Sequence, residues 1–459
     1  MKDLLIKNGM LFSSKEAKHA DILVRDGKIA KVEKDIDANS VNAKVINAEG
    51  LCVLPGIIDS HTHYHLVSRG TATADGFKEG SKLATYGGVT TVIDFADDLK
   101  TISLTDSEKT RTKEMSEMAI DYALHQGVYS MKEDLEDQLS QLKKQGVRVI
   151  KIFTTYKNVG YMLENREDLK RLFAACKKLE LLITAHCEMD DVIQDINNNW
   201  KGGYLPSDHA LLRPAKAEAE GIKMVGEIAL EFDMPLYIVH LSSKAGLEEV
   251  RALRKKGAKL IVETTPHYLF LDKSKLEGEN GPLFVMTPPL RDKEDNIALQ
   301  KALTSGEIQV VATDHCSFTH NQKLESNDCR TIFPGIPGTE ELLPLINTFA
   351  SGGTRLSLMK VVELLSENPA KIFGLYPEKG SLIEGTDADF ILFDPEMSWE
   401  ITKEKIHSKS GYSCYEGMTV NGEVVMTYLK GHLVMGNGVY VGIPGTGLRL
   451  NEGLSSAYK

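Results

Sequence analysis

Residues 147–186 read VRVIKIFTTYKNVGYMLENREDLKRLFAACKKLELLITAH, and this stretch contains the unit from which most of the chain is built. The apolar run VRVIKIF has the length of a buried strand, and REDLKRLFAACKKL has the apolar spacing of a helix. A second apolar run, LLITAH, follows at once. The stretch therefore predicts a strand, a helix and a second strand in succession.

The same alternation extends in both directions, from about Gly56 to Phe373. The number and spacing of the apolar runs predict an α/β fold, a (β/α)8 TIM barrel. A doubly wound sheet is the main alternative, but it should have a glycine-rich phosphate loop after its first strand, and none is present. The eight candidate strands are GIID (56–59), TTVIDF (90–95), ALHQGVYS (123–130), VRVIKIF (147–153), LLITAH (181–186), PLYIVH (235–240), KLIVET (259–264) and IQVVATD (308–314).

The two ends of the chain have a different pattern. Between Leu4 and Val53, and again from Gly380 onward, short apolar runs alternate with turns rich in Gly and Asp, which is typical of antiparallel strands. We therefore expect both termini to form one small β-sandwich domain, residues 1–53 plus 380–459. The barrel would then comprise residues 54–379.

Composition and charge exclude several classes of function. The 54 Lys and Arg residues are outnumbered by 65 Asp and Glu residues, and the net charge of -11 disfavours a nucleic-acid partner. No apolar stretch is long enough to span a membrane, and the start MKDLLIKNGM lacks the pattern of a signal peptide, so we expect a cytoplasmic protein with no membrane partner. The six cysteines include no CxxC pair, so reduced thiols are expected.

Six polar residues lie where predicted strands end. Side chains alternate along a strand, so His61 and His63 point to the same face. In a TIM barrel the C-terminal ends of all strands meet at one mouth, so we expect the six side chains to share a site. Imidazole and carboxylate are suitable ligands for zinc. The six residues are His61, His63, Lys151, His186, His240 and Asp314.

Lys151 does not fit a simple metal site. Four imidazoles and one carboxylate fall short of what two divalent ions need if each also keeps a place for water. An ammonium group would repel the ions, so Lys151 must be neutral, displaced or converted into an anion. The residues by themselves leave all three alternatives open.

Longer motifs carry a resemblance to a known family. The strings GIIDSHTHYH, VRVIKIFTTYKN, TAHCE, YIVHLSS, ETTPHYL, MTPPLRDK, VATDHC and GSLIEGTDADFILFDP occur in the order found in the cyclic amidohydrolases. The chain resembles specifically the dihydropyrimidinase and D-hydantoinase group, over nearly its whole length. This resemblance implies the barrel predicted above and a metal-dependent hydrolase.

The resemblance implies that Lys151 is carboxylated by carbon dioxide and bridges two zinc ions in each subunit. The first ion would be held by His61, His63, Asp314 and the modified Lys151, and the second by the modified Lys151, His186 and His240. A hydroxide bridging the ions would attack the substrate, because zinc lowers the pKa of bound water to about 7.

Other residues of the reaction also follow from the resemblance. Asp314 would take the proton on attack and later give it to the leaving nitrogen. Tyr156 matches a tyrosine that hydrogen-bonds the developing oxyanion, and Thr287 lies in a motif that holds the substrate ring. Pro334 stands where the family often has Asn, and proline lacks a backbone donor, so ring binding there should differ.

The implied substrate is a cyclic ureide or amide, either a dihydropyrimidine or a 5-substituted hydantoin, opened to an N-carbamoyl amino acid. The resemblance also implies a homo-oligomer, a tetramer or a dimer. An allantoinase stays an alternative, whereas a dihydroorotase is disfavoured because residues 64–68 lack the arginine that clamps a carboxylate. A catalytically silent scaffold is disfavoured because all six metal positions are intact.

The remaining polar residues near these motifs are predicted to be structural. His267 and His315 should lie in the core or support the ligand histidines through hydrogen bonds. Cys187 should point away from the site, and Cys316 should lie in the loop beyond it. Arg213 should cap a helix or pair with a glutamate of the following segment, RPAKAEAE.

Overall fold

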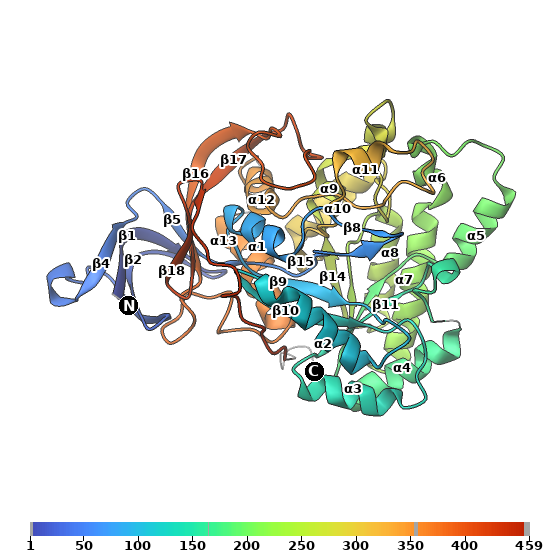
Figure 1. Cartoon of the computed structure of the whole chain (residues 1–459), viewed down its shortest axis with the longest axis horizontal. Coiled ribbons are helices and arrows are strands. Elements are labelled where there is room, and N and C mark those ends of the chain that lie inside the picture. Colours follow the sequence, from blue (N-terminus) through green and yellow to red (C-terminus); the bar gives the residue numbers. More distant parts are fainter. Residues whose placement is uncertain (1–2, 164, 353–356, 454–459) are drawn as a thin grey trace.

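The computed structural model describes residues 3–163, 165–352 and 357–453, and it shows a parallel barrel beside a second sheet (Figure 1). Neighbouring barrel strands pair in chain order. Each of the eight predicted runs overlaps one barrel strand, so the predicted TIM barrel is confirmed. The strands are β6 (Ile57–Asp59), β9 (Val89–Ala96), β10 (Asp121–Gly127), β11 (Val149–Phe153), β12 (Leu182–His186), β13 (Leu236–Ile238), β14 (Leu260–Thr264) and β15 (Val310–Val311).

The barrel closes between its first and last strands. Beyond β6 and β15, Thr62 and His315 form a parallel bridge, and the His63 amide donates to the His315 carbonyl at 2.8 Å. The Thr313 amide donates to the Asp59 carboxylate at 3.0 Å. These bonds hold the ends of the first and eighth strands side by side.

Helices cover the outside of the barrel (Figure 1). Within the stretch 147–186, α4 (Arg166–Lys178) links β11 to β12 and buries Leu169, Leu172 and Phe173 at helical spacing. The helix begins after Asn165, whose side chain accepts a hydrogen bond from the Asp168 amide. The other helices of eight or more residues are α1 (Phe77–Tyr86), α2 (Leu104–Glu114), α3 (Leu135–Lys144), α5 (Asp190–Asn199), α7 (Ala215–Glu231), α8 (Lys244–Lys255), α10 (Lys293–Ser305) and α12 (Leu342–Ser351).

The shortest strands and α-helices of the barrel part lie mostly in the loops that follow the barrel strands. They are the hairpin β7 (Val67–Ser68) with β8 (Thr71–Ala72), and the helices α6 (His209–Leu212), α9 (Pro266–Phe270), α11 (His320–Leu324), α13 (Leu358–Val362) and α14 (Asn368–Ile372).

Both ends of the chain build the second domain, as predicted, and its nine strands belong to one mixed sheet. In this sheet β1 pairs with β2 in antiparallel and with β4 and β5 in parallel orientation. Ile6, Ile22, Phe390 and Tyr428 share its core. The strands are β1 (Asp3–Phe12), β2 (Ala17–Arg25), β3 (Lys28–Glu33), β4 (Ala43–Asn47), β5 (Cys52–Pro55), β16 (Phe390–Glu400), β17 (Thr419–Leu429), β18 (His432–Gly436) and β19 (Val439–Tyr440). The domain limits 1–53 plus 380–459 and 54–379 stay a prediction.

The segment 445–453 lies against the barrel of its own chain. The Tyr122 amide donates to the Leu448 carbonyl at 3.0 Å, and the Leu450 amide donates to the Tyr122 carbonyl at 2.7 Å. Glu452 is buried and accepts a hydrogen bond from the Arg148 amide at 3.1 Å. These contacts attach the last described residues to the barrel wall.

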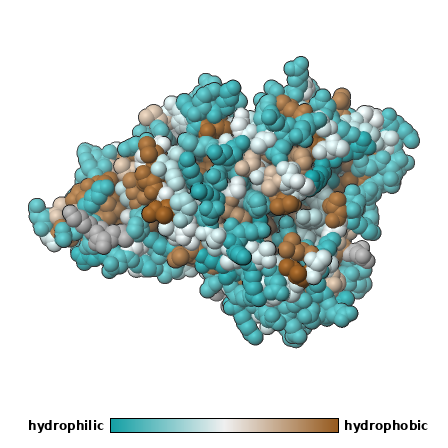
Figure 2. Space-filling model, viewed as in Figure 1, coloured by the Kyte–Doolittle hydropathy of each residue, from teal (hydrophilic) through white to brown (hydrophobic). Residues whose placement is uncertain are grey.

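The surface is mainly hydrophilic on the face shown in Figure 2, and apolar side chains form small, separate groups. Scattered apolar residues of this kind are normal for a folded domain. Among the described residues, no helix has both the length and the apolar composition that a membrane span requires.

A buried lysine joins the barrel to the terminal sheet. Lys379 Nζ lies 2.5 Å from carboxylate oxygens of Asp121 and Asp389 and 2.9 Å from Asp387. Asp121 begins β10 of the barrel, whereas the other two acids lie just before β16 of the terminal sheet. The ion pairs therefore connect the two sheets directly.

We expect Lys379→Met to lower the free energy of unfolding by about 3–5 kcal/mol, because it removes the shared partner of two buried carboxylates and a partly buried one. Urea unfolding followed by circular dichroism measures the effect. The control is Lys18→Met on β2, which removes an exposed lysine paired with exposed Glu16 and should change stability by less than about 0.5 kcal/mol. Equal effects of the two variants would contradict a stabilising role for the buried network.

Candidate active site

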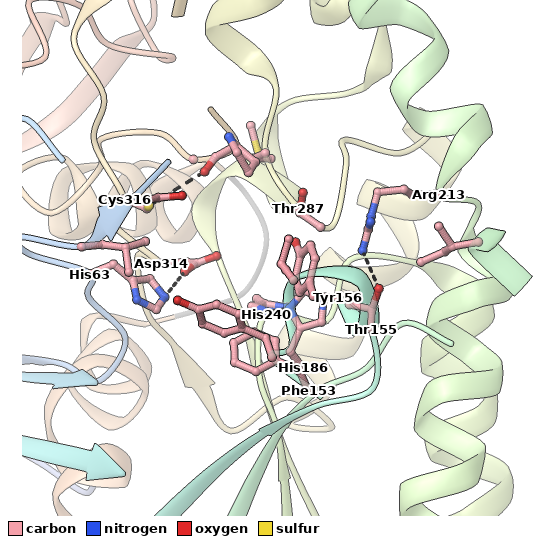
Figure 3. Close-up of a pocket in the computed structure, with 18 of the residues that line it drawn as sticks. His63, Phe153, Thr155, Tyr156, His186, Arg213, His240, Thr287, Asp314 and Cys316 are labelled. Carbon is pink, nitrogen blue, oxygen red and sulfur yellow. Dashed lines mark hydrogen bonds and ion pairs between the residues drawn. The ribbon is translucent and has the colours of Figure 1, made fainter. Parts of the chain in front are cut away.

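A cavity of about 620 Å³ lies at the C-terminal ends of the barrel strands (Figure 3). This volume is in the usual range for small-molecule sites. The eight residues predicted for the site all line it, so the structure brings them together as the strand order requires. They are His61, His63, Lys151, Tyr156, His186, His240, Thr287 and Asp314.

His61, His63 and Asp314 form one group of possible metal ligands, all within 4.8 Å of one another. The Nδ1 atom of His61 lies 2.7 Å from a Glu263 oxygen, so Nδ1 donates and Nε2 keeps its lone pair. That lone pair faces an Asp314 oxygen at 3.3 Å, and His63 Nε2 lies 3.2 Å from the same oxygen. A cation between these acceptors would stabilise the arrangement, so the group fits a metal ion.

His186 and His240 form a second group. His186 Nε2 lies 2.8 Å from Glu188 and therefore donates, leaving a lone pair on Nδ1, which lies 2.9 Å from His240 Nε2. Burial lowers the pKa of both imidazoles, so both are neutral near pH 7. The rings of His240 and His61 lie 5.5 Å apart, so the two groups of ligands are adjacent.

Lys151 lies in the same cavity, near the end of β11, and is buried. Its Nζ atom lies 5.0 Å from the ring centres of Phe95 and Phe153. No carboxylate forms an ion pair with it among the residues that the structure describes, and burial lowers its pKa to about 8. The lysine is therefore not displaced from the site, and a substantial fraction of its amine is neutral near pH 8.

The backbone turns sharply at three of the site residues. His240, Asp314 and Tyr156 have φ angles of 37°, 52° and 70°, in the left-handed region that residues other than glycine rarely adopt. Such backbone conformations concentrate at functional sites because the surrounding fold has to hold them. β13 ends shortly before His240, and β15 ends shortly before Asp314. Both side chains line the cavity.

Comparison with known proteins places this site in a family. Residues 52–434 match the model of the amidohydrolase family. The chain belongs to the amidohydrolase family. It is 35% identical to a D-hydantoinase of Ralstonia pickettii over 97% of this chain and 98% of that protein. It is also 35% identical to a D-hydantoinase of Geobacillus stearothermophilus, over 96% of this chain and 95% of the relative.

The solved structures agree with these relatives. The dihydropyrimidinase from Brevibacillus agri superposes with a TM-score of 0.94 at 32% identity, covering 99% of each chain. The predicted membership of the D-hydantoinase and dihydropyrimidinase group is therefore confirmed, and the protein is a cyclic amidohydrolase. The family is metal-dependent, in keeping with the possible metal ligands His61, His63 and Asp314.

In this amidohydrolase, Arg213 is the C-cap residue of α6, one of the two roles predicted for it, but its side chain makes contacts that were not predicted. It donates to Glu188 at 2.7 Å, and its guanidinium lies 5.0 Å from the ring centre of Tyr156. Pro214 separates Arg213 from α7, which begins at Ala215, so the side chain projects into the cavity instead of along the helix. The prediction that it pairs with a glutamate of that helix is wrong.

Other neighbouring residues mostly follow their predictions. His315 is buried and contacts Asp75 at 3.1 Å through Nε2. Cys187 is buried and does not line the cavity, whereas Cys316 and Pro334 do line it. His267 is buried in the cavity wall, and its ring nitrogens have no hydrogen-bond partner among the described residues.

Two buried glutamates were missed by the sequence analysis. Glu188 and Glu263 each accept a hydrogen bond from a candidate ligand histidine and so fix which ring nitrogen faces the cavity. Although burial opposes ionisation of Glu188, Arg213 and His186 hold its pKa well below the usual range. Glu188 ends the motif TAHCE and Glu263 is next to last in the run KLIVET, and an acid at the end of a buried strand is the signal that could have identified them.

We expect Glu263→Gln to weaken metal binding by about 10- to 100-fold, because an amide cannot accept all the hydrogen bonds that the carboxylate accepts. Glu263 accepts from His61 Nδ1, from the His240 amide at 3.0 Å and from the Tyr237 hydroxyl at 2.7 Å. Competition with a chelator measures the affinity. Glu231→Gln, at an exposed position of α7, is the control, and equal affinities of the two variants would contradict the orienting role.

Proposed function

We propose that the protein is a zinc-dependent hydrolase that opens the cyclic amide bond of dihydropyrimidines or 5-substituted hydantoins to give N-carbamoyl amino acids. The observation that carries this proposal is the convergence of six candidate metal ligands and Tyr156 on one cavity in a chain of this family. The named relatives are D-hydantoinases, and the superposed structure is a dihydropyrimidinase.

The buried polar groups support a dinuclear metal centre. His61, His63 and Asp314 would hold one ion, and His186 and His240 the other, with carboxylated Lys151 shared between them. A low pKa of the Lys151 amine favours this modification, because the neutral amine is the form that reacts with carbon dioxide. Two zinc ions would supply a bridging hydroxide near neutral pH, because zinc lowers the pKa of bound water to about 7.

The chain's own residues would move the protons and bind the ring. In this proposal the Asp314 carboxylate accepts the proton of the attacking water and then donates it to the leaving nitrogen. The Tyr156 hydroxyl donates a hydrogen bond to the oxygen that gains negative charge. Thr287, across the cavity from His186, would hold the polar edge of the ring, while Pro334 has no amide hydrogen to offer.

Ring opening of a substrate panel tests the proposal. The panel contains dihydrouracil, dihydrothymine, 5-phenylhydantoin, allantoin and dihydroorotate, each assayed with zinc and bicarbonate present. We expect turnover of the first three and about two zinc ions per chain, as a dinuclear site requires. Preferential opening of allantoin or dihydroorotate would overturn the substrate assignment, and a chain that binds no zinc would overturn the mechanism.

Assembly and location also stay proposals. We infer a homo-oligomer, a tetramer or a dimer, in the cytoplasm. The described part of the C-terminal segment packs on its own barrel.

A further inference from the structure

A carboxylate that the proposed mechanism does not use faces the cavity at the end of β9. Asp97 follows this strand directly and lines the cavity. One of its oxygens accepts a hydrogen bond from the Tyr129 hydroxyl at 2.8 Å. Among the described residues Asp97 forms no ion pair, so its charge is not matched by a basic side chain of the protein.

The next residue, Asp98, shows what a structural carboxylate looks like at the same place. Asp98 accepts hydrogen bonds from the Tyr129 and Ser130 amides at 3.1 Å and pairs with Lys132 at 2.9 Å. These partners satisfy the hydrogen-bonding capacity of the Asp98 carboxylate, and the carboxylate holds the loop that contains them in place. The two adjacent acids therefore differ, because only Asp97 is turned toward the cavity without a cation.

The nearest arginine is engaged elsewhere. Arg111 donates to Asp94 at 2.7 Å and to the Tyr64 carbonyl at 2.6 Å, and among the described residues it forms no ion pair with Asp97. Burial raises the pKa of Asp97 despite the Tyr129 hydrogen bond and the nearby Arg111 charge. A ligand cation would form the direct ion pair that Asp97 lacks among the described residues.

A cluster of aromatic rings begins at Tyr129, the hydrogen-bond donor to this carboxylate. The ring centres of Tyr129 and Tyr161 lie 4.7 Å apart, and those of Tyr129 and Phe153 lie 5.5 Å apart. All three rings line the cavity, and Figure 3 shows Phe153 beside His186, next to the candidate metal site. Aromatic faces attract cations, and a carboxylate beside them offsets the cost of removing a cation from water.

We propose that Asp97, Tyr129, Phe153 and Tyr161 form a subsite for a positively charged substituent on the substrate ring, such as the ammonium group of an aminoalkyl side chain. The substrate class would then be hydantoins or dihydropyrimidines with a cationic side chain. This inference rests on the proposed function and narrows it.

Two hydantoins of equal length test the subsite in the unmodified enzyme. 5-(4-Aminobutyl)hydantoin carries an ammonium group where 5-pentylhydantoin carries a methyl group. We expect kcat/KM to be about 10-fold higher for the amine, as expected for a charge-assisted hydrogen bond with a cation–π contact. A ratio of one or less would overturn the proposal.

Variants assign the preference to Asp97. Asp97→Asn keeps the shape of the side chain, Asp97→Leu makes it apolar, and both should bring the ratio of kcat/KM values to about one. Asp106→Asn, which removes an exposed charge on α2, should keep the wild-type ratio. A wild-type ratio in both Asp97 variants would show that Asp97 serves only to anchor Tyr129, and would overturn the proposal.

Two further outcomes separate this inference from the proposed function. Arg69 also lines the cavity, so 5-(4-carboxybutyl)hydantoin is included, and a preference for this anion would overturn the cationic subsite while leaving hydantoin hydrolysis intact. If the zinc-loaded enzyme opens none of the hydantoins or dihydropyrimidines, the proposed function itself fails, and the subsite with it.

Discussion

Lys151→Ala should abolish hydrolysis and empty the metal site. If carboxylated Lys151 joins both ions, its removal takes away a ligand from each, and the remaining imidazoles and Asp314 must hold two cations alone. The loss of kcat/KM should therefore far exceed the roughly 100-fold effect typical of residues that only orient a ligand. Ring opening and the zinc content of the purified variant are the two measurements.

Chemical rescue of Lys151→Ala by a small acid distinguishes loss of the metal-bridging group from misfolding of the variant. Short carboxylic acids such as acetate or propionate fit the space left by the lysine side chain and should restore part of the activity together with the zinc. The control is Lys144→Ala, at an exposed position of α3, which should match the wild-type enzyme. Full activity of Lys151→Ala without added acid would refute the bridging role.

The sequence predicts the barrel and the position of the site for the same physical reason. Parallel strands buried on both faces read as continuous apolar runs, and a polar residue at the end of such a run is conspicuous. His186 and His240 were found in this way, and both lie in the cavity. The helices predicted between the runs indicate that strands and helices alternate. In such a barrel the strands are parallel, so their C-terminal ends all lie at the same mouth.

The partners of the site residues could not be predicted from the sequence. The contact between Arg213 and Glu188 depends on Pro214, which ends one segment and lets the arginine turn into the cavity instead of following α7. The contact between His61 and Glu263 joins the first and seventh strands of the barrel, which lie 202 residues apart in the sequence. Only the closed barrel brings such pairs together.

Asp97 shows a second limit of sequence reasoning. It stands beside Asp98 in the string FADDLK, and two adjacent acids after a strand resemble an ordinary solvated turn. The structure distinguishes the two acids. Asp98 forms an ion pair with Lys132 and accepts hydrogen bonds from two backbone amides, whereas Asp97 faces the cavity. The sequence pattern alone does not indicate which of two adjacent acids is paired with a lysine and hydrogen-bonded in the folded protein.

Asp314→Asn should reduce kcat by about 10²- to 10⁴-fold, the range expected when a general acid–base group is removed. The amide has the shape of the carboxylate and can still offer an oxygen to a metal ion, but it cannot accept the proton of the attacking water. The loss should therefore appear mainly in kcat, with KM changed much less.

The zinc content and the pH profile distinguish this chemical role of Asp314 from a purely structural one. The variant should keep most of its zinc, because His61 and His63 still face the same position, and the acidic limb of the kcat profile should disappear with the carboxyl group that titrates. Asp137→Asn, exposed near the start of α3, should leave both properties unchanged. If Asp314→Asn instead loses its zinc in proportion to its activity, Asp314 acts as a ligand only, and the proton must be carried by another group in the cavity.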